Sequence, residues 1–97
     1  MGNDMTKTVE VFKALASETR LKIVIGLVKV GDLGCINNVN LMADMLGIAQ
    51  PNVSQHIAIL KNAGIIKGYR KGTQICYEIV DQQTKDIIKA LKLCMTE

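Results

Sequence analysis

Apolar residues recur along the first part of the chain with the 3.6-residue period of amphipathic helices. The first pattern contains two neighbouring stripes, of which Met5, Val9, Phe12 and Ala16 form one and Thr8, Val11 and Leu15 form the other. Because two stripes are more than one packing surface uses, we expect this helix to pack on two sides. Residues 1–4, which precede it, are expected to form a flexible arm.

A second helical pattern follows Ser17, a residue type that caps helix N-termini well, and Glu18 suits the positive end of that helix. We expect its buried stripe to consist of Leu21, Val24, Ile25 and Val28. Gly31 and Gly34 then interrupt the pattern. The chain therefore starts with two helices joined by a short connection.

Two further helices are predicted with little chain between them. Val39–Leu46 is a short third helix that Asn37 or Asn38 can cap, and Gly47 stands where a left-handed C-terminal residue is favoured. The fourth helix has Pro51 in its first turn and closes at Gly64. Its core face consists of Val53, Ile57, Leu60 and, less centrally, Ala63.

The outward face of the fourth helix is polar but uncharged. Gln55 and Asn62 point away from the core face, Asn52 and Ser54 flank them, and the chain's only histidine, His56, lies near the edge of the buried stripe. An amide carries a donor and an acceptor in one plane and so matches the N6/N7 edge of adenine. The face therefore favours base reading in DNA, although most polar helix faces are simply solvated.

The segment after Gly64 predicts two strands and a last helix. Ile75, Tyr77 and Ile79 alternate on one strand face, and Lys71-Gly72 offers a basic hairpin tip. Beyond Asp81 a helix runs to the C-terminus, with an apolar side formed by Ile87, Ile88, Leu91, Cys94 and Met95.

Composition favours one small domain that spans residues 1–97. The 97-residue chain is 48% hydrophobic but has only one Phe, two Tyr and no Trp, so aliphatic side chains must fill the core. No apolar run approaches the roughly 20 residues that a membrane span needs. The N-terminus has no apolar core of the kind a secretory signal requires, and three cysteines make no disulfide framework. We therefore expect a cytoplasmic protein without a cofactor.

The distribution of charge is more informative than the net charge of +3. No carboxylate occurs between Asp44 and Glu78. That segment contains Lys61, Lys67, Arg70 and Lys71. Its surface should therefore carry a positive potential that attracts nucleic acid.

Three linked segments resemble the ArsR/SmtB family of bacterial repressors: "ALASETRLKIV" (Ala14–Val24), "LMADMLGIAQPNVSQHIAILKNAGII" (Leu41–Ile66) and "GYRKGTQICYEI" (Gly68–Ile79). The likeness extends over residues 9–97. It implies a mostly α winged helix-turn-helix fold in the order α-α-α-α-β-β-α. It also implies a homodimer built from the first and last helices, two recognition helices in successive major grooves of an operator, and an inducer that releases the DNA.

Specific DNA contacts follow from both lines of reasoning. We expect four residues to contact base edges or adjacent phosphates: Gln50, Asn52, Ser54 and Gln55. The family pattern adds His56 as a phosphate or edge contact, while a merely structural, hydrogen-bonded histidine remains equally open. The basic tip, Arg70 and Lys71, would hold phosphates or enter the minor groove.

The residues at the family's metal sites are different here. Asn38–Asn40 replaces a Cys-Val-Cys thiolate pair, and amides are poor ligands for soft metals. At the C-terminal site, Asp-x-His and His-x-x-Glu become Asp81-x-Gln83 and Cys94-x-x-Glu97. Without imidazoles, Asp81, Cys94 and Glu97 are weak zinc candidates, and a metal-responsive repressor is an alternative rather than our main hypothesis.

Thiol chemistry fits the remaining residues somewhat better. One branch of the family is thought to sense sulfide or oxidants through a cysteine in the second helix and another in the last, and Cys94 resembles the latter. We hypothesise that Cys35 and Cys94 form the sensor, although Cys35 lies past the second helix and Cys94 could be inert core. Cys76 is interpreted as structural. A constitutive repressor is the simpler alternative, and the sequence does not name the inducer.

Other function classes fit less well. An enzyme is not expected, because the one histidine has no paired acids nearby and no glycine-rich phosphate loop occurs. A winged-helix module that binds another protein instead of DNA is the more credible rival.

Overall fold

The computed structural model describes the backbone of residues 2–29 and 39–95 and the side chains of residues 5–28 and 39–91. In chain order the elements are α1 (Gly2–Leu15), α2 (Glu18–Lys29), α3 (Val39–Leu46), α4 (Gln50–Asn62), β1 (Ile66–Lys71), β2 (Gln74–Ile79) and α5 (Gln82–Met95). This order confirms the predicted winged helix-turn-helix architecture. Helix α1 begins at Gly2, so it includes three of the four residues for which we expected a flexible arm.

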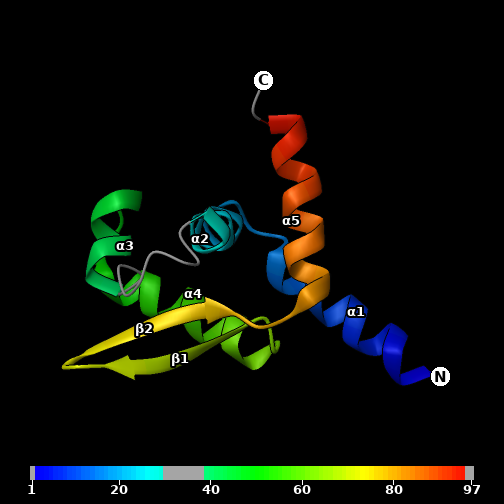
Figure 1. Cartoon of the computed structure of the whole chain (residues 1–97), viewed down its shortest axis with the longest axis horizontal. Helices are drawn as coiled ribbons and strands as arrows, with labels where there is room; N and C mark the ends of the chain where they lie inside the picture. The colour runs from blue at the N-terminus through cyan, green and yellow to red at the C-terminus, as the bar shows by residue number, and fades with distance from the viewer. Residues whose placement is uncertain (1, 30–38, 96–97) are drawn as a thin grey trace.

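Helix α2 occupies the middle of the molecule (Figure 1). It contacts α1, α3, α4, α5 and β2. Helices α1 and α5 lie on one side of it, whereas α3 and the tip of the hairpin lie on the other (Figure 1). Within the described residues no helix is both long and apolar enough to cross a bilayer. Helix α1 also contacts α4, and α5 contacts β2, so the two sides of the molecule are joined by these contacts as well as through α2.

The buried face of α2 differs from the predicted stripe. Ile23, Val24 and Leu27 are buried, while Leu21, Ile25 and Val28 are only partly buried. Of the predicted stripe, only Val24 is therefore correct as a fully buried position. The cause is the central place of α2, because a helix with neighbours on several sides does not bury a single stripe.

Helix α1 has one buried side and one exposed apolar side. Val11, Ala14 and Leu15 belong to the core. Of the other stripe, Met5 is 68% exposed, Val9 42% and Phe12 54%. Among the residues that the structure describes, this second apolar side therefore remains largely uncovered.

Glycines end both α3 and α4. Gly47, after α3, has φ of 69°, and Gly64, after α4, has φ of 78°. Glycine adopts this left-handed conformation without the Cβ penalty of other residues. Both predicted helix ends are confirmed, whereas the predicted caps Asn37 and Asn38 lie outside the described residues.

The hairpin pairs β1 with β2 in antiparallel register, and Lys71 opposite Gln74 is the last pair before the turn. Ile79 and Cys76 are both buried although they point to opposite faces of β2. Ile75, which shares a face with Ile79, is 47% exposed. The predicted alternation of Ile75, Tyr77 and Ile79 therefore does not give one buried face. On the face that carries Ile75, Tyr77 and Ile79, burial decreases toward the tip, whereas Cys76 on the other face is fully buried.

Asp81 caps the N-terminus of α5. Its Oδ2 accepts hydrogen bonds from the backbone N–H of Thr84 at 2.9 Å and from the Thr84 hydroxyl at 2.7 Å. Thr84 and Ile88 are fully buried, so this cap fixes the start of α5 against the core.

The cap should contribute measurably to stability. We expect Asp81→Ala to lower the free energy of unfolding by about 1–2 kcal/mol, because it removes an N-cap and leaves a buried hydroxyl without its acceptor. Urea denaturation monitored by circular dichroism measures the change. As a control, Asp86→Ala removes only an exposed hydrogen bond from Gln82, which is worth a few tenths of a kcal/mol. Equal losses in the two variants would contradict the assignment.

Candidate nucleic-acid interface

The two faces of α4 are sharply different. Val53 and Leu60 are fully buried and Ile57 nearly so. The predicted base-reading residues Gln50, Asn52, Ser54 and Gln55 are all exposed. All four side chains are therefore accessible to a large partner.

The start of α4 is favourable for an anion. Ala49, at the N-cap position, is extended and makes no side-chain capping bond, and Pro51 occupies the first turn. The first turn of α4 has no acidic residue. The positive end of the helix dipole is therefore not neutralised by an acidic residue of its own first turn and can attract a phosphate.

Basic side chains extend the interface onto the hairpin. Lys61, Lys67, Arg70 and Lys71 are exposed. In the described part of the chain, the ion pairs join Lys13 to Glu10 at 3.7 Å and Lys22 to Glu18 at 3.3 Å, so none of the four basic residues forms an ion pair there. Glu78 is the cross-strand partner of Lys67, and Arg70 and Lys71 are paired with the uncharged Ile75 and Gln74. The positive potential predicted from the sequence is consequently available at the surface.

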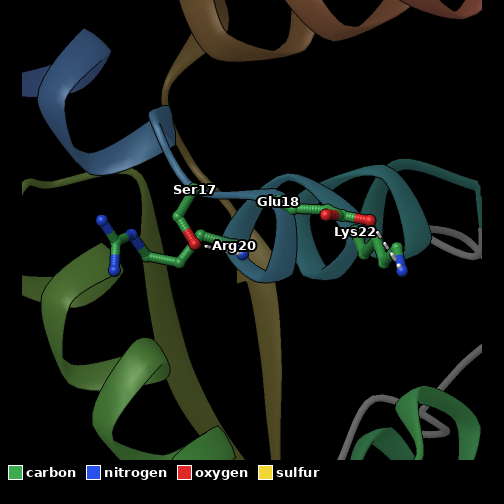
Figure 2. Close-up of polar contacts among 4 residues, drawn as sticks. All are labelled: Ser17, Glu18, Arg20 and Lys22. Carbon is green, nitrogen blue, oxygen red and sulfur yellow. Dashed lines mark hydrogen bonds and ion pairs between the residues drawn. The ribbon is translucent and has the colours of Figure 1, made fainter.

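His56 is half-buried and makes a contact that the sequence did not predict. Its Nδ1 lies 3.2 Å from a terminal guanidinium nitrogen of Arg20 on α2. Figure 2 shows the Arg20 side chain extending in the opposite direction from Glu18 and Lys22. Arg20 is 36 residues from His56 in the chain, and no local pattern indicates the pairing. The structural interpretation of His56 therefore accounts for one ring nitrogen and leaves Nε2 for another partner.

The predicted metal residues are not brought together in the described part of the chain. Asp81 already accepts two hydrogen bonds on Oδ2 as the cap of α5. Glu97 and the side chain of Cys94 lie outside the described residues. Among the residues whose positions are described, no group of three His, Cys, Asp or Glu side chains could hold a metal ion.

Cys76 has a role that the sequence analysis did not predict. It is fully buried on β2 and is disulfide-bonded. The sequence pattern indicates only a structural role for Cys76 and favours sulfur chemistry at Cys35 and Cys94. Cys35 and the side chain of Cys94 both lie outside the described residues.

Comparison with known sequences places these features in a family. Residues 38–67, which include α3, the turn and α4, match the model of the bacterial regulatory protein arsR family. The chain is also 42% identical over 83 residues to MJ1325 of Methanocaldococcus jannaschii, an HTH-type transcriptional regulator, covering 86% of this chain and 89% of that protein.

Solved structures have the same fold. The transcriptional repressor PagR of Bacillus anthracis superimposes with a TM-score of 0.82 at 31% identity, covering 94% of this chain and 99% of PagR. The homodimeric winged helix-turn-helix domain of Mb0332 from Mycobacterium bovis gives a TM-score of 0.80 at 24% identity, covering 96% of this chain and 82% of that one. The likeness to Mb0332 concerns the fold alone.

Proposed function

The chain belongs to the ArsR family of transcriptional regulators, and from this premise we propose that it is a homodimeric repressor that binds operator DNA through α4 and the hairpin. The observation that carries the proposal is the exposed amide face of α4 beside a hairpin whose basic side chains form no ion pair among the described residues. Its relatives are transcriptional regulators and not enzymes, in agreement with the expectation from the sequence.

In this proposal α4 reads base edges in the major groove. Asn52 and Gln55 supply planar amides, which bind the N6/N7 edge of adenine through two hydrogen bonds. Gln50 is the first residue of α4, and Ser54 lies about one turn further along the helix. Both bind base edges or neighbouring phosphates. Neutral side chains favour sequence discrimination here, because a lysine at the same positions would bind any phosphate without regard to sequence.

The hairpin supplies affinity without sequence choice. Arg70 and Lys71 are at or next to the turn, where they hold phosphates or enter the minor groove. Lys61 and Lys67 add to the field that attracts the duplex. This division of roles makes separate predictions for the two parts of the interface.

Two alanine variants separate these roles. We expect Gln55→Ala to relax preference at one operator position by about 1–3 kcal/mol and to leave the salt dependence of binding unchanged. Lys71→Ala should weaken all sequences about equally and reduce the slope of log K against log[salt] by about 1. Fluorescence anisotropy with operator and scrambled duplexes at several salt concentrations measures both effects.

Lys22→Ala is the matched control, because Lys22 is an exposed lysine on α2 that is paired with Glu18. It should leave the slope unchanged. If Gln55→Ala and Lys71→Ala behave alike, the proposed division is wrong. If binding to a partner is insensitive to salt, the molecule is a protein-interaction module instead.

The homodimer is proposed from the exposed apolar side of the molecule. Met5, Val9 and Phe12 on α1 are exposed, and Leu91 on α5 is 40% exposed. Large apolar side chains gathered on neighbouring elements are typical of a protein interface. A second copy would cover them and would keep the hairpin tip free, since the tip lies on the other side of α2 from α1 and α5 (Figure 1). We propose residues 1–97 as the single domain of each subunit.

A charge on this face tests the dimer. We expect Phe12→Asp to give a monomer in analytical ultracentrifugation, because burying a carboxylate in an apolar interface is costly. Operator affinity should fall by about 10²–10⁴, since two linked recognition helices bind more tightly than one. Helix content should be retained, as Phe12 is outside the core. In the control, Met45→Asp changes a side chain on α3 that is 74% exposed and should leave the protein dimeric. A dimeric Phe12→Asp variant would contradict the proposed interface.

Thiol oxidation is the inducing chemistry that we propose, with Cys35 and Cys94 as the sensing residues. The disulfide at the buried Cys76 shows that a cysteine of this chain can be oxidised. Because three cysteines form only one disulfide within a chain at a time, a bond between Cys35 and Cys94 would form in a state in which Cys76 is reduced. In the reaction, a peroxide takes two electrons from two thiols, the thiol protons leave with its oxygens as two waters, and a disulfide forms. The DNA-bound form is the reduced one.

Serine variants test this proposal. Peroxide treatment should lower the operator affinity of the wild type, and a Cys35→Ser, Cys94→Ser double variant should keep its affinity, because one remaining cysteine cannot form a disulfide within one chain. Continued response of that variant would contradict the proposal. Cys76→Ser identifies the pair: a retained response assigns the disulfide to Cys35 and Cys94, and a lost response assigns it to Cys76 and one of them. Peptide mapping by mass spectrometry checks each result.

A further inference from the structure

We propose that Arg20 is a positioning residue for DNA recognition, which acts by holding the ring of His56 so that its Nε2–H is donated to the duplex. The inference rests on the proposed function, because it assigns a role within the same DNA interface. It goes beyond that proposal by naming a residue on α2 that does not touch the operator and by fixing which atom of His56 does.

Arg20 makes three hydrogen bonds that fix its place. Its backbone N–H donates to the Oγ of Ser17 at 3.3 Å, which is the predicted N-cap bond of α2. Its Nε donates to the carbonyl of Ala14 at 2.5 Å. A terminal guanidinium nitrogen reaches Nδ1 of His56 at 3.2 Å. From the first turn of α2, the Arg20 side chain thus links the last turn of α1 to the middle of α4.

The chemistry of the pair determines the direction of its hydrogen bond. A guanidinium has donors only and stays protonated in proteins. Nδ1 of His56 must therefore be the acceptor, which means that it carries no proton. In a neutral imidazole the proton then resides on Nε2, and this nitrogen is a donor. Arg20 consequently selects one tautomer of His56, independently of the local sequence of α4.

The position of His56 on α4 makes that donor useful. Exposed Asn52 and Gln55 lie within one turn of it, and His56 itself is half-buried. Nδ1 faces Arg20 on α2, and Nε2, which is separated from it by Cε1, points in a different direction and remains available as a donor. A phosphate oxygen or the N7 and O6 of guanine would accept from it. With the ring already oriented, less side-chain freedom is lost on binding.

The fork of the guanidinium is necessary for this arrangement. Nε and a terminal nitrogen point to two different acceptors, Ala14 and His56, at the same time. A lysine ammonium at the same position keeps the positive charge but is a single point on a flexible stem, so it cannot reproduce both bonds with the same geometry. Arg20→Lys therefore separates the geometric role of Arg20 from its charge.

A double-mutant cycle on operator binding tests the proposal. Arg20→Lys and His56→Ala should each weaken binding about tenfold, as expected for one hydrogen bond to a charged partner. The double variant should also be only about tenfold weaker than wild type, because Arg20 acts through His56. Lys22→Gln is the control: it is on the same helix, extends away from Arg20 (Figure 2) and pairs with Glu18, so it should leave affinity unchanged alone and combined with His56→Ala.

Nitrogen-15 NMR of the histidine ring in the free protein supplies a readout that a loss of fold would not mimic. The wild type should show Nδ1 without a proton and a single tautomer, and Arg20→Lys should shift the Nδ1 resonance. A proton on Nδ1 in the wild type, or equal losses from Arg20→Lys with and without His56, would overturn the proposal. A wild type that binds no DNA would overturn the proposed function and the role in recognition with it, while the NMR result would still decide the hydrogen bond.

Discussion

The interface depends on the burial of Val53, Ile57 and Leu60, the three side chains that hold α4 against the core. Burying an aliphatic side chain of this size contributes roughly 1.5–3 kcal/mol. Turning α4 about its axis would expose these apolar side chains and bury polar ones. Both changes cost free energy, because apolar burial is lost and polar groups lose their water. The core therefore fixes the rotation of the helix, and the amide face is outward for that reason.

Neutral and basic side chains are found on different elements of the proposed interface. The helix itself contributes neutral hydrogen-bonding groups, while the hairpin contributes basic groups that form no ion pair among the described residues. Helix α2 lies between this surface and the apolar side of α1 and α5, and it contacts both sets of elements. Arg20 belongs to that central helix, so its bonds to Ala14 and His56 connect the proposed dimer side to the proposed DNA side.

The sequence predicted those features that depend on local patterns. The bounds of α3, the glycine ends at Gly47 and Gly64, and the buried face of α4 all follow from residue type and spacing within a few residues. It failed where tertiary neighbours decide. The stripe of α2 was wrong because the helix is packed on several sides, and the Arg20–His56 contact was missed because it joins residues 36 positions apart. The disulfide of Cys76 was missed for the same reason, since pairing depends on distance in the fold and not on spacing in the chain.

The central claim is that the outward face of α4, fixed by its buried side, meets the duplex together with the hairpin. Mapping amide chemical shifts by NMR, while the protein is titrated with duplex DNA from its own promoter, tests this most directly. The account predicts that the largest shifts fall on Gln50, Asn52, Ser54 and Gln55 of α4 and on Arg70 and Lys71 of the hairpin. Shifts concentrated on α1 and α5, with α4 and the hairpin unchanged, would contradict it.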